Sequence, residues 1–266
     1  IRLRIWNDPY NEKGETYGGG DCSVENELEI GKEATKYGMK VLVDFHYSDF
    51  WADPAKQILP KAWQKDADNP DKISEDIYEY TRDTLKKFKD AGVNVTMVQV
   101  GNEITKGMAG VHSTTGDAWT NPDKYTVLDK YLNAGSKAVR EVTPNALVTL
   151  HIETPNRDNY SKIMDAWEKG NVDYDVLGSS YYPFWWNTTD QLNDVQTLAE
   201  ERGKLFCVME TSWVNSYEDG DGTPNSIGSG YDLWQYEIGP QGQVDELTDM
   251  YKVLTSHDNG LGGFYW

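Results

Sequence analysis

The stretch VQVGNEIT, residues Val98 to Thr105, places a glutamate directly after a run of strand-forming residues. Asn102 and Glu103 are poor strand residues, so the strand is predicted to end near Gly101. One interpretation is that Gly101 and Asn102 form a turn and that Glu103 begins the next helix, where a carboxylate suits the helix dipole. The other interpretation is that the chain places a carboxylate at a strand end for chemistry.

Around this stretch, short apolar runs alternate with longer amphipathic runs along the whole sequence. We predict strands at 1–6, 39–45, 94–100, 146–152, 174–181, 204–210 and 261–266. We predict helices near 23–37, 71–91, 123–142, 156–169, 190–202 and 241–257. Ser23, Asn69 and Asn121 are suited to begin the first three of these helices. Alternation of this regularity predicts a parallel sheet with covering helices.

The expected fold class is α/β, and more narrowly a (β/α)8 TIM barrel formed by a single catalytic domain over residues 1–266. The chain length of 266 residues is close to the size of one such barrel. Both ends of the chain fall inside a predicted strand, so we expect a segment that holds strands two to eight and lacks the first strand and the tail. The alternative is an open doubly wound sheet, but the glycines at 18–20 lack the spacing of a dinucleotide-binding turn.

The composition argues against several classes of function. The chain has 25 Lys and Arg against 44 Asp and Glu, and the resulting charge of −19 would repel nucleic acids and anionic membranes. No apolar stretch is long enough to span a bilayer. Cys22 and Cys207 provide neither a disulfide framework nor a metal-binding spacing. The 10 Trp and 17 Tyr are numerous, and several lie in loop-like segments such as 46–54 and 181–187, which suggests a surface that stacks on rings.

Two of the predicted strands end in a glutamate. In a barrel of this kind, catalytic side chains come from the C-terminal ends of the strands. Glu103 and Glu210 occupy the ends of the fourth and seventh strands when the missing first strand is counted. Cleavage of a glycosidic bond needs two carboxyl groups, one protonated to assist the leaving oxygen and one ionised to attack the anomeric carbon. We therefore predict Glu103 and Glu210 as the catalytic residues.

Other strand-end residues suit supporting roles. Asn102 could hydrogen-bond the 2-hydroxyl of a sugar. His46 and His151 could bind a sugar or tune a nearby carboxylate. Arg2 and Arg4 share one face of the first strand, and an arginine inside a barrel needs a carboxylate, for which Glu210 is the available candidate. A salt bridge at the floor of the barrel is the alternative for the arginines.

A glycine-rich acidic loop near the C-terminus is a candidate metal site. Asp219, Asp221 and Asn225 place oxygen ligands at alternate positions, as calcium loops do, but no closing glutamate follows at the twelfth position, so the loop is not an EF-hand. A plain acidic loop is the alternative.

Taken together, the motifs resemble those of glycoside hydrolase family 53, the endo-β-1,4-galactanases. The resemblance rests on these motifs, which run in family order along the whole chain: RLRIWNDPY, YGGG, GMKVLVDFHYSDFWADPAKQ, PKAW, VQVGNE, NAGSKAVRE, VDYDVLGSSYYPFWW, VMETSW, EDGDG and GGFYW. The resemblance implies Glu103 as acid/base and Glu210 as nucleophile. It also implies endo-acting cleavage, with retention, of β-1,4-galactan in the type I arabinogalactan side chains of pectin.

The resemblance further implies a supporting shell around these two residues. With the strand-end and loop residues, the predicted substrate-binding set is Arg2, Arg4, Asn7, His46, Asp49, Trp51, Asn102, His151, Tyr181, Tyr182, Trp213 and Trp266. The chemistry needs no cofactor, and a structural calcium at Asp219, Asp221 and Asn225 is implied by bacterial members. The expected partner is the polysaccharide, with no nucleic acid or membrane. We expect a monomer that is secreted, periplasmic or at the cell surface.

Three alternatives to this function remain open from the sequence. A non-catalytic glycan-binding barrel would use the tryptophans alone, although the two strand-end glutamates argue against it. A metal-dependent barrel hydrolase would need clustered histidines, whereas these are scattered. Another retaining glycosidase, such as a β-mannanase or a cellulase, would share the same carboxylates.

Overall fold

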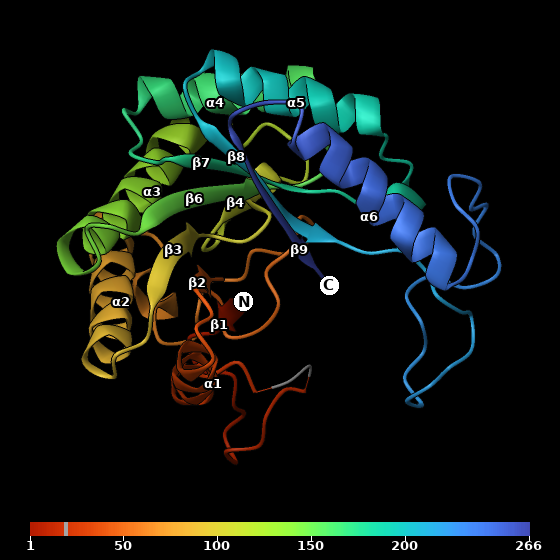
Figure 1. The fold of residues 1–266 in the computed structure, drawn as a ribbon. Coiled ribbons are helices and arrows are strands. Elements are labelled where there is room, and N and C mark those ends of the chain that lie inside the picture. The colour runs from red at the N-terminus through yellow and green to blue at the C-terminus, as the bar shows by residue number, and fades with distance from the viewer. Residues whose placement is uncertain (19–20) are drawn as a thin grey trace. The chain divides into compact units, whose positions relative to one another are not determined.

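The computed structural model describes residues 1–18 and 21–266, so Gly19 and Gly20 of the YGGG motif lie outside the described residues. The chain forms two compact units, and Figure 1 labels their helices and strands. The first unit holds residues 1–152 and 161–176, and the second holds residues 153–160 and 177–266.

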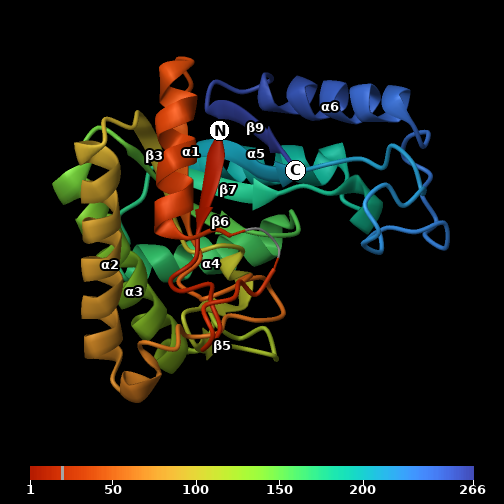
Figure 2. The same cartoon turned by 90° about the horizontal axis from the view of Figure 1, so that it is seen from below.

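The first unit is built on a parallel sheet with the strand order β1-β2-β3-β6. Its strands are β1 (Arg2–Ile5), β2 (Val41–Phe45), β3 (Val95–Val100) and β6 (Leu147–Ile152). Its helices are α1 (Val24–Lys36), α2 (Pro70–Asp90) and α3 (Pro122–Val142), with short 3-10 helices at Gln64–Asp66 and Ile104–Lys106. Helices α2 and α3 lie side by side in both ribbon views (Figures 1 and 2). Helix α4 (Arg157–Lys169) has residues in both units.

The second unit repeats the alternation of strand and helix. It contains β7 (Val176–Ser180, from Leu177 on), the 3-10 helix Pro183–Trp185, α5 (Thr189–Glu201), β8 (Leu205–Thr211), α6 (Pro240–Leu254) and β9 (Gly260–Tyr265). The strand order is β7-β8-β9, and β8 pairs with β9 in parallel. The residues from Ser212 to Gly239 form a long connection between β8 and α6.

The helix boundaries follow from the local sequence. Each of the residues Ser23, Asn69 and Asn121 caps its helix, because its side chain accepts a hydrogen bond from a backbone N–H in the first turn. The predicted strands and helices are confirmed to within a few residues at each end. The sequence reasoning missed the capping box of α5, in which Thr188 and Gln191 satisfy each other's backbone N–H groups.

Short elements after β3 were also missed. A hairpin of two short strands, β4 (Gly107–Met108) and β5 (Val111–His112), follows the 3-10 helix that begins at Ile104. Elements of two or three residues have no periodicity to detect, so hydrophobic patterning cannot predict them.

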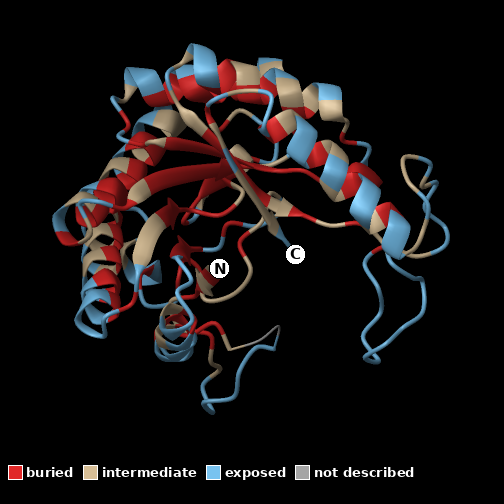
Figure 3. Ribbon diagram, in the orientation of Figure 1, coloured by how far each residue is buried: buried red, intermediate tan, exposed pale blue. Residues whose placement is uncertain are grey.

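Burial follows the layered arrangement that the sequence predicted. The strands are largely buried and the outer faces of the helices are exposed (Figure 3). All five residues of β2 are buried, as expected for a parallel strand that is covered on both faces. In the described residues, no helix combines the length and the apolar character that crossing a bilayer requires.

Helix α3 carries one buried carboxyl group that the hydrophobic pattern does not explain. Asp129 is 3% exposed, and both of its carboxyl oxygens are buried without a hydrogen-bond partner among the described residues. Gly170 fits closely against it, since a Cβ at that position would lie 2.2 Å from Oδ2 of Asp129. Burial raises the pKa of Asp129 to about 7. The neutral acid is therefore the form that this site favours.

We expect Asp129→Asn to remove a pH-dependent loss of stability. Because the pKa of Asp129 is raised in the folded state, its contribution to the free energy of unfolding is complete below its ordinary pKa and is lost as the pH rises through about 7. The wild type should lose this contribution between about pH 4 and pH 8, and the Asn variant should not. The free energy of unfolding of the variant relative to the wild type should therefore rise by up to about 4 kcal/mol over this range. Urea denaturation across this pH range measures the difference. The exposed Asp68→Asn is the matched control, and an equal gain in that variant would contradict the assignment.

Candidate active site

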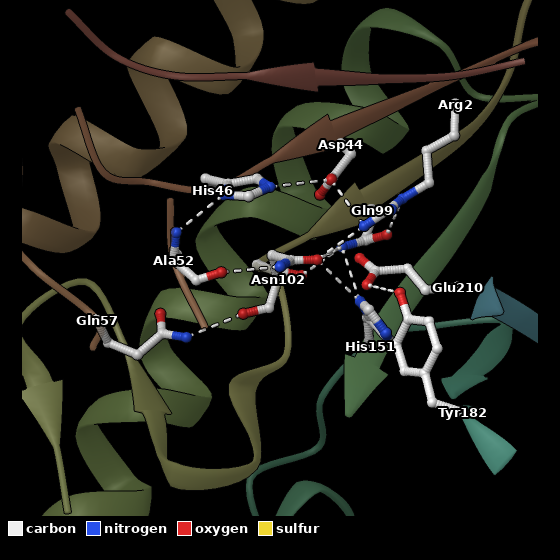
Figure 4. Close-up of polar contacts among 11 residues, drawn as sticks. Arg2, Asp44, His46, Ala52, Gln57, Gln99, Asn102, His151, Tyr182 and Glu210 are labelled. Atoms are coloured by element: carbon white, nitrogen blue, oxygen red, sulfur yellow. Dashed lines mark hydrogen bonds and ion pairs between the residues drawn. The ribbon is translucent and has the colours of Figure 1, made fainter. Parts of the chain in front are cut away.

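In the first unit, Arg2 from the start of β1 and polar side chains near the carboxyl ends of β2, β3 and β6 form one buried hydrogen-bonded cluster. Figure 4 shows these side chains pointing toward one another: Arg2, Asp44, Gln99, Asn102 and His151. Asp44, Gln99 and His151 are 0% exposed, and Asn102 is 4% exposed. Parallel strands place their carboxyl ends at one edge of the sheet, which is why residues far apart in sequence meet here.

Arg2 connects the members of this cluster. Its guanidinium forms an ion pair with Asp44, with 2.9 Å between Nη2 and Oδ2. Nε donates to Oε1 of Gln99 at 3.1 Å, and Nη2 donates to Oδ1 of Asn102 at 2.7 Å. Asp44, which we had not predicted as a site residue, is thus a carboxylate partner of Arg2. A contact between an arginine of β1 and Glu210 stays a prediction.

Asn102 is held on both sides of its side-chain amide. Oδ1 lies within hydrogen-bond distance of Arg2, Gln99 and His151, and Nδ2 donates to the carbonyl of Ala52 at 2.8 Å. These donors and this acceptor fix which way the amide points. One N–H of the amide is left over for a further acceptor, since the group has two N–H donors.

Neighbouring groups define the tautomer of His46. Nδ1 of His46 accepts from the backbone N–H of Ala52 at 3.1 Å, so the proton lies on Nε2, which donates to Asp44 at 3.2 Å. Nδ1 of His151 lies 2.9 Å from Oδ1 of Asn102 and 3.2 Å from Nε2 of Gln99. Burial lowers the pKa of His151 well below its usual value, with smaller contributions from Arg2 and His46. His151 is therefore a neutral hydrogen-bonding residue.

Glu103 has a left-handed backbone conformation, with φ 46° and ψ 50°. It precedes the 3-10 helix Ile104–Lys106, and its side chain makes no capping hydrogen bond there. Gly101 and Asn102 form the bend, and Glu103 lies at the start of a helix as that interpretation has it, but the helix is a 3-10 helix of only three residues. Gln57 supports the bend by donating to the carbonyl of Asn102 at 2.9 Å. The Glu103 side chain is half-exposed, so it is available to a ligand.

Aromatic rings cover the loop that follows β2. The guanidinium of Arg4 lies 4.3 Å from the ring centroid of Trp51, and Trp51 packs edge-on against Trp6 at 5.2 Å. Asn7 is anchored through its backbone N–H to the carbonyl of Ser48.

Asp49, in the same loop, binds protein groups with both carboxyl oxygens. It accepts from the backbone N–H of Asp8 at 3.1 Å and from that of Lys61 at 2.7 Å. Burial raises the pKa of Asp49. These contacts indicate that Asp49 ties the loops together.

In the second unit, Glu210 occupies the end of β8 and is half-exposed. The hydroxyl of Tyr182 donates to Oε2 of Glu210 at 2.9 Å (Figure 4). The backbone N–H of Tyr181, at the end of β7, donates to the carbonyl of Glu210 at 2.8 Å. The Tyr181 side chain itself is buried, and burial raises its pKa. The carboxylate is therefore oriented by one hydroxyl and its backbone by the neighbouring strand.

Next to Tyr182 the second unit has an open cavity of about 430 Å³. Its walls include Tyr182, Trp185, Trp213 and Trp266 together with polar residues of the connection after β8. The backbone N–H of Trp266 donates to the carbonyl of Thr211 at 2.8 Å, which fixes the last residue beside the end of β8. The indole N–H of Trp213 donates to the carbonyl of Glu237 at 2.7 Å. Flat rings and polar groups in one cavity suit a sugar.

The predicted metal ligands of the acidic loop take part in turn contacts. Oδ1 of Asp219 accepts from the backbone N–H groups of Asp221 and Gly222, and Oδ1 of Asp221 accepts from that of Thr223. Asn225 donates through Nδ2 to the carbonyls of Tyr217 and Glu218. Within residues 1–18 and 21–266, no group of three or more His, Cys, Asp or Glu is placed to hold a metal ion. In this conformation the loop residues stabilise turns.

Sequence reasoning missed Asp44, Gln99 and Gln57 as parts of the site. A detectable signal existed for the first two, because both interrupt apolar strands at positions where a charged or amide side chain must be satisfied. Gln57 lies in a loop and had no such signal.

A parallel order of strands and helices, with glutamates at two strand ends, is typical of barrel glycoside hydrolases. The family model described as glycosyl hydrolase family 53 matches residues 1–266. The chain belongs to this family, and the prediction of a (β/α)8-barrel fold is thereby confirmed.

Individual relatives agree with the family assignment. The chain is 45% identical over 269 residues to an endo-beta-1,4-galactanase of Bacillus subtilis (strain 168). The aligned region covers all of this chain and 60% of that protein. The solved GH53 catalytic domain of Ignisphaera aggregans is 36% identical with a TM-score of 0.91, covering all of this chain and 73% of that one. A solved fungal beta-1,4-galactanase is 26% identical with a TM-score of 0.81, at 100% and 76% coverage. The chain thus spans about 60% of the length of the Bacillus relative.

The backbone at Glu103 leads to a prediction about stability. A left-handed conformation strains any residue with a Cβ by about 1 kcal/mol, so Glu103→Gly should be more stable than Glu103→Ala by about that amount. Chemical denaturation of the two variants measures the difference. Glu79, exposed inside α2, is the matched control: there Gly should be less stable than Ala by about 1 kcal/mol. The same sign at both positions would rule out the left-handed assignment.

Proposed function

We propose that the protein is an endo-acting, retaining β-1,4-galactanase that cleaves the galactan side chains of type I arabinogalactan. The observation that carries the proposal is the pair of half-exposed glutamates at strand ends, Glu103 and Glu210. It is supported by membership of family 53 and by relatives that are named galactanases.

In the proposed mechanism Glu210 is the nucleophile and Glu103 the acid/base. Glu210 attacks the anomeric carbon while Glu103 protonates the leaving oxygen, and the glycosyl-enzyme is then hydrolysed by a water that Glu103 deprotonates. The O–H of Tyr182 donates to Oε2 of Glu210 and so orients the carboxylate for attack. The mechanism requires a separation of about 5–5.5 Å between the two carboxyl groups.

The cluster in the first unit would bind the sugar beside Glu103. The remaining N–H of Asn102 is suited to the 2-hydroxyl, a contact that strengthens in the transition state. Arg2 and His151 hold Asn102 without being in the path of proton transfer, because both already bind its Oδ1. In the second unit, the rings of Trp185 and Trp266 would stack on the faces of galactose residues.

The proposal also covers cofactors, oligomeric state and location. Two carboxyl groups supply all of the chemistry, so no cofactor takes part. A structural calcium would take Oδ2 of Asp219, Oδ2 of Asp221 and Oδ1 of Asn225, since the turn contacts made here use the other oxygen of each Asp and the Nδ2 of Asn225. We propose a monomer acting outside the cytoplasm, since its polymeric substrate does not enter cells.

The roles of the two glutamates can be separated with azide. Glu103→Ala removes protonic assistance, so azide should partly restore its turnover of an aryl galactoside or galactobioside with a good leaving group, giving a product of retained configuration. Glu210→Ala should be inactive towards that substrate, and any azide product should have inverted configuration. Product stereochemistry is read by NMR.

The roles would be refuted if both variants responded to azide alike, or if the wild-type product were inverted. Activity on mannan or cellulose without activity on galactan would show that the proposed substrate is wrong. The catalytic roles of the two glutamates would still stand.

Trp266 and Trp185 should affect activity differently. Trp266 is tied to the end of β8. Trp266→Ala should therefore raise the activation free energy that kcat/KM reports by about 2 kcal/mol, on short and long galactans alike. Trp185 contributes to the same cavity from the 3-10 helix Pro183–Trp185 and not from the end of β8, so Trp185→Ala should weaken only the binding of long substrates. Reducing-sugar assays on galactan and on short galacto-oligosaccharides make the comparison. Equal losses for both variants on both substrates would contradict this division.

A further inference from the structure

Glu103 lies on a bend between β3 and the 3-10 helix Ile104–Lys106. Its left-handed backbone, with φ 46° and ψ 50°, is a conformation that a residue with a Cβ keeps only where its surroundings enforce it. The contacts that enforce this conformation also decide where the Glu103 side chain points. Two buried side chains, those of Gln57 and Trp119, make such contacts.

Gln57, from the loop after β2, donates to the bend through its side-chain amide. It is 3% exposed, and its Nε2 donates to the carbonyl of Asn102 at 2.9 Å and to that of Asp53 at 3.2 Å. The carbonyl of Glu103 lies 3.5 Å from the same nitrogen, so two N–H groups serve three carbonyls and one N–H is shared. Oε1 is buried without a hydrogen-bond partner among the described residues, so the amide acts here through its donors alone.

Trp119 holds the next carbonyl along the chain. It is 4% exposed, and its indole N–H donates to the carbonyl of Ile104 at 3.0 Å. The ring packs edge-on against Trp167, with 5.7 Å between the ring centroids, which fixes the direction of the N–H. Side-chain donors thus bind carbonyls on both sides of Glu103.

These contacts constrain both backbone dihedral angles of Glu103. The carbonyl of Asn102 belongs to the peptide plane that precedes Glu103, and the orientation of that plane sets φ. The carbonyl of Glu103 belongs to the plane that follows, which sets ψ, and Trp119 holds the plane after that through Ile104. Since these angles determine the direction of the Cα–Cβ bond, the donors determine where the carboxyl group points.

The loop that carries Gln57 is itself anchored to the hairpin β4–β5. The carbonyl of Gln57 accepts from the backbone N–H of Gly110 at 2.8 Å. Nε2 of His112 lies 3.1 Å from the carbonyl of Pro54 in the same loop. These bonds do not involve Asn102, so Gln57 meets the bend as a donor that is already held in place.

We propose that Gln57 and Trp119 are positioning residues for the acid/base: by binding the carbonyls around Glu103 they hold its carboxyl group where it can protonate the leaving oxygen. The inference rests on the proposed role of Glu103. In this role neither side chain touches the substrate or carries a proton.

Substrates with different leaving groups test the proposal in the full-length protein. The leaving sugar of galactan needs a proton from Glu103, whereas dinitrophenolate departs without one. Gln57→Met has a similar length but no donor. It should lower kcat/KM on galactan by about 10- to 100-fold, the cost of a misplaced catalytic group, and lower kcat/KM on a dinitrophenyl β-galactobioside by less than about threefold.

Trp119→Phe is the second variant, because it keeps an aromatic ring and removes the indole N–H. It should show the same selective loss on galactan, and it decides the question if Gln57→Met does not fold. Equal losses on the two substrates in the variants that fold would overturn the proposal, since a general loss of structure lowers both activities alike.

Gln196→Met is the matched control. Gln196, on α5, is 0% exposed, and its Nε2 donates to the carbonyl of Leu254 at 3.1 Å, as that of Gln57 does to Asn102. This variant should lose stability but keep the wild-type ratio of kcat/KM on the two substrates. A selective loss on galactan in Gln196→Met, as large as that in Gln57→Met, would also overturn the proposal.

A double-mutant cycle separates this inference from the proposed reaction, because it needs no activity. Glu103→Gly should be more stable than Glu103→Ala while the left-handed conformation is enforced. If Gln57 enforces it, this advantage of Gly should shrink when Gln57→Met is combined with each variant, as urea denaturation of the four proteins measures. A smaller advantage in a chain without galactanase activity would reject the function but keep the positioning. An unchanged advantage would reject the positioning by Gln57 itself.

Discussion

The ion pair between Arg2 and Asp44 is the interaction on which the candidate site of the first unit depends. Both side chains are buried, and a buried pair stabilises only if its remaining donors and acceptors are satisfied. Here Nε of Arg2 donates to Gln99, Nη2 also donates to Asn102, and His46 binds the same carboxyl oxygen of Asp44 as Arg2 does, whereas Oδ1 of Asp44 is buried without a hydrogen-bond partner among the described residues. The cost of burying charge at this strand edge therefore produces a rigid array of polar side chains, in which removing one member leaves the others unsatisfied.

This array has a direct consequence for Glu103. The chain leaves β3 through Gly101 in a left-handed conformation with φ 85°, and a Cβ there would lie 2.6 Å from Ile104. Asn102, bound on both sides of its amide, then directs the chain into a second left-handed residue, Glu103 itself. Strain of this kind persists only where surrounding contacts enforce it, and such sites are commonly functional.

The second unit positions its glutamate by different means. Glu210 is oriented by the hydroxyl of Tyr182, and its backbone is held by Tyr181 on one side and, through Thr211, by Trp266 on the other. The hydroxyl of Tyr182 donates to Glu210, whereas Glu103 lies on a left-handed backbone before a 3-10 helix, so the two glutamates have unlike surroundings. Two carboxyl groups in unlike surroundings are what a double-displacement reaction needs, because one must be ionised when the other is protonated.

The sequence alone determined the strands, the helices and the two strand-end glutamates. Hydrophobic alternation, capping residues such as Asn69 and Asn121, and polar residues that interrupt apolar runs are local signals, and local physics fixes them. Only the tertiary structure decided that Arg2 pairs with Asp44, that Asp49 ties loops together and that Gln57 binds the carbonyl of Asn102. These partners come from elements separated by about 10 to 50 residues. Which of many carboxyl groups meets a given hydroxyl or guanidinium depends on strand register and helix packing, and a one-dimensional pattern does not encode that choice residue by residue.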